Sequence, residues 1–177
     1  MPRRRFLTLH IISQGFDLIN KARDPGRLLA TGSRAAGASL ATFGAGAQLH
    51  RHQKLFQAAL GHMVDAVFVV SREGRVTLSN TAATRLFGFS HFAGVRDATA
   101  EFPTLFQLRH LDGRPIESPE MATSRALKGE TVVDDDQVIH NLVSGQDRFI
   151  RVSSAPIRDA GGQTVGVVTV ARDVTEL

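Results

Sequence analysis

Few side chains in this sequence could do chemistry, and no set of them has the spacing of a catalytic site. Three consecutive acids, Asp134, Asp135 and Asp136, offer oxygen ligands for a cation. In a strand only alternate residues share a face, and no further acids converge on them, so a charged edge that protects a sheet is the better interpretation. No Ser/His/Asp set, carboxylate pair or phosphate-binding loop has supporting context. We therefore predict neither catalysis nor a metal site.

Histidines and arginines are the remaining candidates for ligand binding. Cysteine is absent, which excludes disulfides, thiolate metal sites, cysteine nucleophiles and photochemistry through a cysteine adduct. Three histidines fall in irregular segments or near a strand end and are interpreted as surface residues: His91, His110 and His140. Three arginines could pair with a carboxylate ligand or lie on the outer face of a sheet: Arg148, Arg151 and Arg158.

The charge is unevenly distributed along the chain. Residues 1–54 contain nine Lys and Arg against two Asp, a net charge of +7, whereas residues 55–177 carry −3, which gives +4 for the whole chain. The two parts therefore differ chemically. Residues 1–48 are interpreted as a basic, Ala/Gly-rich extension, either a linker or a weak helix, because each glycine weakens a helix by about 1 kcal/mol relative to alanine.

This basic extension could bind nucleic acid or an anionic membrane surface. Its charges are dilute and no recognition-helix motif accompanies them, so we expect a solvated leader without a nucleic-acid partner. The arginines at 3–5 look like the start of an export signal, but polar residues and Asp17 interrupt the apolar stretch after them. No apolar stretch of 18 residues predicts a membrane span, and the interpretation is a cytoplasmic protein.

Residues 49–64 are predicted to form an amphipathic helix that leads into a folded domain over 65–177. Apolar residues recur there at helical spacing, and Leu49, Phe56 and Met63 stand seven apart. Such a helix could pack on its own sheet or on the same helix of a second copy. We predict a homodimer to which this helix contributes.

The folded domain begins with a predicted β-hairpin over 65–79, whose first strand is rich in β-branched and aromatic residues. Asn80 can cap a short helix directly after the hairpin, and Gly88 can end it in the left-handed conformation. Residues 89–117 are predicted to be irregular.

The second half of the domain is predicted to hold one helix and three strands. Ser118 supplies a capping hydroxyl for the helix and Gly129 can end it. The strands come next, at roughly 131–140, 147–155 and 164–173. The expected fold is α+β, a five-stranded antiparallel sheet with helices over one face.

Six fragments of this region resemble the PAS domain family, the sensory module of bacterial kinases and regulators. Each fragment is weakly specific by itself, but all six occur in the family's order and spacing, and the region covers about two-thirds of the chain. The fragments are 68–76, 79–88, 112–115, 125–130, 153–159 and 172–177. The resemblance implies strand order 2-1-5-4-3 and a pocket between the sheet and the helices of 80–129.

The resemblance also indicates which residues would carry function. The pocket would be lined by Phe68, Leu86, Phe106, Leu127, Ile150 and Val168. Asp173 and Thr175 match the Asp-x-Thr that, in the family, ties the last strand to the following helix and so to an output domain. No kinase, nucleotide-binding or helix-turn-helix motif comes after it, so we expect a missing or separate effector.

The resemblance does not identify a cofactor. Haem-binding relatives use a histidine on the helix before the third strand, and the predicted helix 119–128 has none. Without cysteine an adduct-forming flavin is excluded, whereas a non-covalent flavin is not, although no tryptophan is present to stack on it. An unidentified small organic ligand, or a packed core without one, is favoured.

The sequence therefore predicts a non-enzymatic sensory and dimerisation module. It would bind a small ligand or a partner and signal through its C-terminal strand. The alternatives are a haem- or flavin-containing gas or redox sensor, and a nucleic-acid-associated regulator that acts through the basic extension.

Overall fold

The computed structural model describes residues 38–176, and the expectations for residues 1–37 lie outside the described part of the chain. Short 3-10 helices are labelled η. The elements in chain order are α2 (Ala38–His62), β1 (Ala66–Ser71), β2 (Val76–Ser79), α3 (Thr81–Phe87), η2 (Phe92–Gly94), α4 (Ala98–Leu105), η3 (Ser118–Glu120), α5 (Ala122–Leu127), β3 (Val132–His140), β4 (Asp147–Arg158) and β5 (Thr164–Asp173).

The five strands form one antiparallel sheet in the order β2-β1-β5-β4-β3, which confirms the predicted topology. The register places Thr169 of β5 opposite Phe68 of β1 on one side and opposite Ser154 of β4 on the other. These three residues therefore lie in one row across the middle of the sheet. A Cβ at Gly166 would lie 2.7 Å from the carbonyl oxygen of Val70, so β1 and β5 depend on a glycine there.

One face of the sheet packs against α3, α4 and α5 through a core of phenylalanine rings. The rings meet mostly edge to face, an arrangement that adds about 0.5–1.5 kcal/mol per pair beyond the buried area. Ring centroids lie 4.9 Å apart for Phe68 and Phe92, and 4.7 Å apart for Phe87 and Phe106. The core therefore joins strand β1 to the whole segment between β2 and α5.

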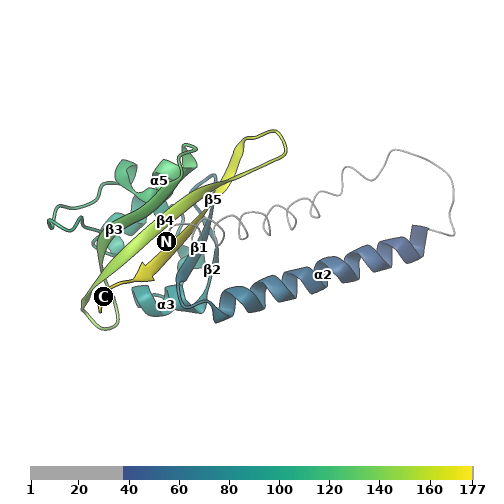
Figure 1. Ribbon diagram of the computed structural model, residues 1–177, viewed down its shortest axis with the longest axis horizontal. Helices are drawn as coiled ribbons and strands as arrows, with labels where there is room; N and C mark the ends of the chain where they lie inside the picture. Colours follow the sequence, from purple (N-terminus) through teal and green to yellow (C-terminus); the bar gives the residue numbers. More distant parts are fainter. Residues whose placement is uncertain (1–37, 177) are drawn as a thin grey trace.

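The other face of the sheet carries a smaller apolar cluster that receives the C-terminal end of α2. Leu60 of α2 is buried there with Val67, Val69, Ile157 and Val168. The helix itself is 25 residues long and begins at residue 38, inside the stretch interpreted as a linker or weak helix. Figure 1 shows α2 extending from this attachment away from the domain.

Helix α3 is bounded as predicted. The Asn80 side chain accepts a hydrogen bond from the Ala83 N–H at 3.0 Å, and Gly88 comes after the helix with a φ of +63°. A Cβ at Gly88 would also lie 2.6 Å from the Asn141 side chain and from the Val143 nitrogen. The glycine thus permits close contact between α3 and the turn that joins β3 to β4.

The segment 89–117 is more regular than predicted, because it contains α4. Asp97 caps this helix by accepting hydrogen bonds from the Thr99 and Ala100 N–H groups. Pro103 lies inside the helix. Because proline normally disrupts a helix, the sequence pattern did not predict one here.

The helix predicted from Ser118 is divided into two. Glu117, rather than Ser118, caps η3, and it forms a reciprocal capping box with Glu120. Met121 then adopts an extended ψ of 137°, so that α5 begins only at Ala122. The prediction of a single helix capped by the Ser118 hydroxyl was therefore wrong.

Candidate functional site

A small cavity lies in the apolar core between the sheet and the helices. Its volume is about 40 Å³, whereas pockets for small organic ligands usually measure about 300–1,000 Å³. Thirteen residues line it: Phe68, Val70, Phe87, Phe102, Leu108, Met121, Ala122, Thr123, Gln137, Ile150, Val152, Thr169 and Ala171. With the rings placed in this way, the cavity has room for a water-sized occupant.

Polar side chains form one edge of this internal cavity. The Oγ1 atoms of Thr123 and Thr169 lie 3.0 Å apart, and the Ser154 Oγ lies 2.9 Å from the Thr169 Oγ1. This buried chain of hydroxyls joins α5 to β5 and β4. The buried Ser124 hydroxyl has no hydrogen-bond partner among the described residues.

Neither haem nor a flavin fits the internal cavity at its present size. None of the lining residues is a histidine that could hold iron, and the volume falls far below that of either group. His140 instead lies at the end of β3, where its Nδ1 is 3.1 Å from Asp147. Binding of a large cofactor would require the phenylalanine core to open.

Two of the six predicted pocket residues, Phe68 and Ile150, line the internal cavity. Leu86 and Phe106 belong to the same core without lining the cavity itself. Leu127 is half-buried at the end of α5 and lies outside this set. The structure thus brings four of the predicted residues into one core.

Val168 lies on the opposite face of the sheet, which corrects its assignment to the pocket. It pairs with Val69 and packs in the cluster that receives Leu60 of α2. Its neighbour Thr169 faces the cavity instead. Because β5 is apolar at most of its inner positions, its sequence does not reveal which residues share a face.

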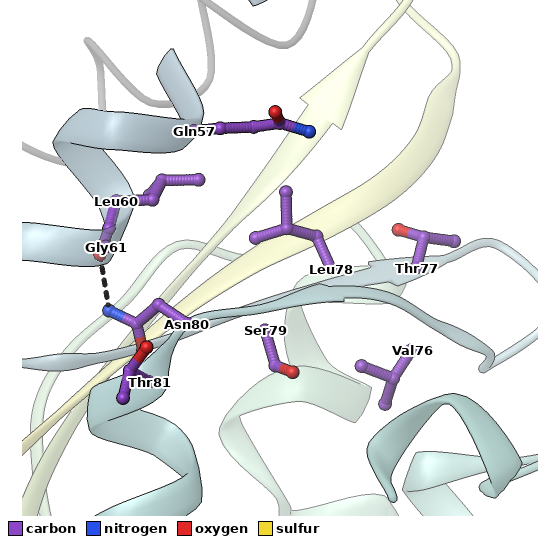
Figure 2. Close-up of a pocket in the computed structure, with 9 residues that line it drawn as sticks. All are labelled: Gln57, Leu60, Gly61, Val76, Thr77, Leu78, Ser79, Asn80 and Thr81. Atoms are coloured by element: carbon purple, nitrogen blue, oxygen red, sulfur yellow. Dashed lines mark hydrogen bonds between the residues drawn. The ribbon is translucent and has the colours of Figure 1, made fainter. Parts of the chain in front are cut away.

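A groove between the end of α2 and the edge strand β2 has a volume of about 480 Å³ and is shown in Figure 2. Asn80 is buried at its end. The amide group of Asn80 donates to the carbonyl oxygens of Leu60 and Asp65, at 3.1 and 3.0 Å. Its Oδ1 accepts from the Val67 N–H at 3.0 Å, in addition to its capping bond to α3. One side chain thus connects α2, β1 and α3.

Part of the predicted dimer helix packs against the sheet of its own chain. Phe56 and Met63 are half-buried and pack against the apolar cluster on the outer face of the sheet. Leu49 lies in α2, but its side chain is outside the described part. On another side of the helix, Leu55 is 62% exposed and is flanked by exposed alanines at 58 and 59. This side carries no contact with the sheet cluster.

Asp173 and Thr175 close a turn that fastens the end of β5 to β4, and we call these two residues with Phe149 the C-terminal latch. The Thr175 N–H and hydroxyl donate to the Asp173 Oδ1 at 3.0 and 2.5 Å. The Phe149 N–H donates to the Thr175 hydroxyl at 3.0 Å, and the Val174 N–H donates to the Phe149 carbonyl at 2.8 Å. The latch therefore continues the pairing of β4 beyond the end of β5.

The β3–β4 turn beside the latch is held by polar contacts. The Asn141 amide donates to the Arg85 and Leu86 carbonyls at the end of α3, at 3.0 and 2.9 Å. Arg109 donates to Asp147 at 2.6 Å, and this hydrogen bond, with a second from His140, lowers the pKa of the Asp147 carboxyl. Sequence reasoning missed Asn141 because its partners lie more than fifty positions away.

The three consecutive acids belong to an irregular part of β3. Asp134 has a φ of +55° where the register with β4 shifts. Asp136 receives two hydrogen bonds from Arg151, at 2.6 and 2.7 Å, on the outer face of the sheet. Within the described residues, no three potential ligands cluster closely enough to hold a metal ion.

Arg148 and Arg158 also have partners within the chain. Arg158 donates to the carbonyl oxygens of Gly129 and Gly162. Arg148 lies 4.0 Å from Asp173.

Over residues 38–176, no helix combines the length and hydropathy that crossing a membrane would need.

Comparison with known proteins agrees with this architecture. The family model described as PAS fold matches residues 60–177. The crystal structure of a PAS domain from Colwellia psychrerythraea is 21% identical with a TM-score of 0.50, covering 71% of this chain and 98% of that one. A PAS domain of an HTR-like protein from Haloarcula marismortui is 14% identical with a TM-score of 0.51, covering 73% and 97%.

A PAS domain of the fruit-fly ELK potassium channel is 11% identical with a TM-score of 0.51, covering 70% of this chain and 98% of that one. No curated protein was found to match. Identities this low show the fold alone, whereas the family match extends over well more than half of the chain. The chain therefore belongs to the PAS family.

Proposed function

We propose that this chain is a non-enzymatic sensory and dimerisation module that signals through its C-terminal strand, with an effector that is attached to it or separate from it. PAS domains are generally sensory rather than catalytic, which supports this class of function. The observation that carries the proposal is the C-terminal latch. Its hydrogen bonds join Asp173, Thr175 and Phe149 at the end of β5, so breaking them would release this end of the strand.

A signal would reach the latch along β5. Helix α5 contacts this strand through the Thr123–Thr169 hydroxyl pair, and the latch closes four residues beyond Thr169. A ligand or partner that favours one packing of α5 on the sheet would shift the population of closed latches. Such a ligand would be a small molecule that enters when the phenylalanine core opens, and such a partner would be a protein that binds to the outside of the domain. Either would act in the cytoplasm.

Replacing Thr175 by valine tests whether the latch is an independent local unit. The variant removes the acceptor of the Phe149 N–H and a donor to Asp173. We expect amide hydrogen exchange at Phe149 to accelerate about tenfold, with a change in global unfolding free energy below about 1 kcal/mol.

Thr131→Val is the matched control, because Thr131 is an exposed threonine immediately before β3. It should leave exchange at Phe149 unchanged. Equal exchange in Thr175→Val and in the unmodified chain would show that the latch contributes nothing to the order of β4.

Dimerisation through α2 is tested by the mass of the full chain in solution. Size-exclusion chromatography with light scattering should give twice the monomer mass of 19.2 kDa. Leu55→Glu would place a charge on the exposed apolar side of α2 and should weaken the dimer at least about tenfold, since burying an unpaired charge costs more than about 1.4 kcal/mol.

Leu111→Glu is the control, because Leu111 is 60% exposed and lies outside α2. It should leave the dimer intact. A full chain that remains monomeric at every concentration would remove dimerisation from the proposed function and leave the latch proposal standing.

A further inference from the structure

A second cleft lies on the surface where α3 meets the ends of β4 and β5. Its volume is about 300 Å³, at the lower limit of pockets that hold small organic ligands. Eight residues line it: Val64, Ala66, Ala82, Arg85, Leu86, Arg148, Ala171 and Asp173. We call it the Arg85–Arg148 cleft. It is several times larger than the cavity inside the core.

The floor of the Arg85–Arg148 cleft is apolar. Ala66, Ala82, Leu86 and Ala171 are all buried, so the floor is part of the packed domain rather than a mobile surface. Val64, in the connection between α2 and β1, forms part of the wall and is 90% exposed. A ligand that covers this exposed valine and the apolar floor is stabilised by the burial of apolar surface, so a partly apolar ligand is favoured.

The polar part of the cleft is mainly positive. Arg85 comes from α3 and Arg148 from β4, and within the described residues Arg85 is exposed and forms no ion pair. The Nη1 of Arg148 lies 4.0 Å from the Asp173 Oδ2, too far for a hydrogen bond. The other oxygen of Asp173 already accepts both hydrogen bonds from Thr175.

We propose that the Arg85–Arg148 cleft binds a small monocarboxylate that carries an apolar tail. A guanidinium presents paired N–H donors that match the two oxygens of a carboxylate. The two arginines would hold this group at the rim while the tail lies over the alanines and Leu86. Asp173 at the same rim disfavours a second negative charge, so the cleft suits a monoanion better than a dianion.

Benzoate is a suitable probe for this site, with acetate and benzylammonium as comparisons. Each is titrated into the ¹⁵N-labelled full chain at constant ionic strength, with amide chemical shifts as the readout. Benzoate should give saturating shifts centred on Val64, Arg85 and Ala171, with an affinity at least about tenfold above that of acetate, because only benzoate covers the floor. Benzylammonium, with the opposite charge, should give none.

The variants Arg85→Gln and Arg148→Gln should each weaken benzoate binding about tenfold, the loss expected for a charge-assisted hydrogen bond. Arg96→Gln is the control, since Arg96 is an exposed arginine outside the cleft, and it should change nothing. Thermal unfolding midpoints confirm that all variants fold. Should Arg148→Gln fail to fold, the exposed Arg85 alone decides the test.

The proposal is overturned if benzoate shifts do not saturate, if acetate binds equally well, or if Arg85→Gln leaves the affinity unchanged. It is also overturned if the shifts centre on the internal cavity at Phe68 and Met121. Asp173 belongs to both the cleft and the latch. Benzoate binding is nevertheless read from its own amide shifts, and not from the oligomeric state or from exchange at Phe149, so failure here would leave the proposed sensory function untouched.

Discussion

Replacing Phe68 by alanine should lower the free energy of unfolding by about 4 kcal/mol, within the range for a buried phenylalanine. Phe68 lies on β1, between β2 and β5 in the sheet, and is only 3% exposed. Its ring meets those of Phe87, Phe92 and Phe102 edge to face, with centroids 5.2, 4.9 and 5.9 Å away. The substitution removes the ring that these three share, so both the buried area and the ring contacts are lost.

The same substitution should enlarge the internal cavity, which Phe68 lines. A cavity enlarged in this way, with mostly apolar walls, can bind a small apolar molecule such as benzene. Urea denaturation with and without saturating benzene therefore measures both effects. The midpoint should fall in the variant and recover in part with benzene, while the slope with urea stays unchanged.

Phe149→Ala provides the comparison, because Phe149 is also a phenylalanine in a strand but is 46% exposed on the outer face. We expect it to cost less than about 1 kcal/mol. A loss below about 1.5 kcal/mol for Phe68→Ala would contradict a tightly packed phenylalanine core. It would instead favour a core that is already loose enough to admit a ligand.

The local features of the fold were predictable because their causes are local. The helix cap at Asn80 and the left-handed glycine at Gly88 each depend on a few neighbouring residues, and the structure has both. The strand order was implied only by the family resemblance. Short patterns specify strands and turns, whereas they do not specify which strands pair.

The features that sequence reasoning missed depend on contacts between distant residues. Val168 lies in a continuous apolar run, so nothing local shows which side of the sheet it faces. Helix α4 contains Pro103, which in a sequence pattern indicates a break. The Arg85–Arg148 cleft joins residues more than sixty positions apart, and the sequence showed Arg148 only as one of three arginines that could meet a carboxylate.

Asn80 combines a local role, the cap of α3, with contacts to residues that are distant in the sequence. Asn80→Ala should lower the free energy of unfolding by about 3 kcal/mol. The side chain is 6% exposed and makes four hydrogen bonds to backbone groups. The alanine variant loses the cap of α3, at about 1 kcal/mol, and leaves the Val67 N–H without its partner, at about 1 kcal/mol. It also loses the hydrogen bonds to the Leu60 and Asp65 carbonyls, at about 1 kcal/mol together.

The effect of Asn80→Ala should be unevenly distributed in the structure, because Asn80 supplies a polar contact between α2 and the domain. Amide exchange at Met63, whose N–H donates to the Leu60 carbonyl, should accelerate more than exchange in β4. Urea denaturation gives the global loss, and hydrogen exchange gives its distribution.

Asn80→Ser separates the two roles of the side chain. Serine is a good helix cap but is too short to reach the Leu60 carbonyl, so it should recover about 1 kcal/mol of the loss while exchange at Met63 stays fast. Ser79→Ala, at the exposed neighbouring position, should stay within about 0.5 kcal/mol of the unmodified chain. If Asn80→Ser restored both stability and protection at Met63, the cap alone would account for Asn80, and α2 would be held by its apolar contacts.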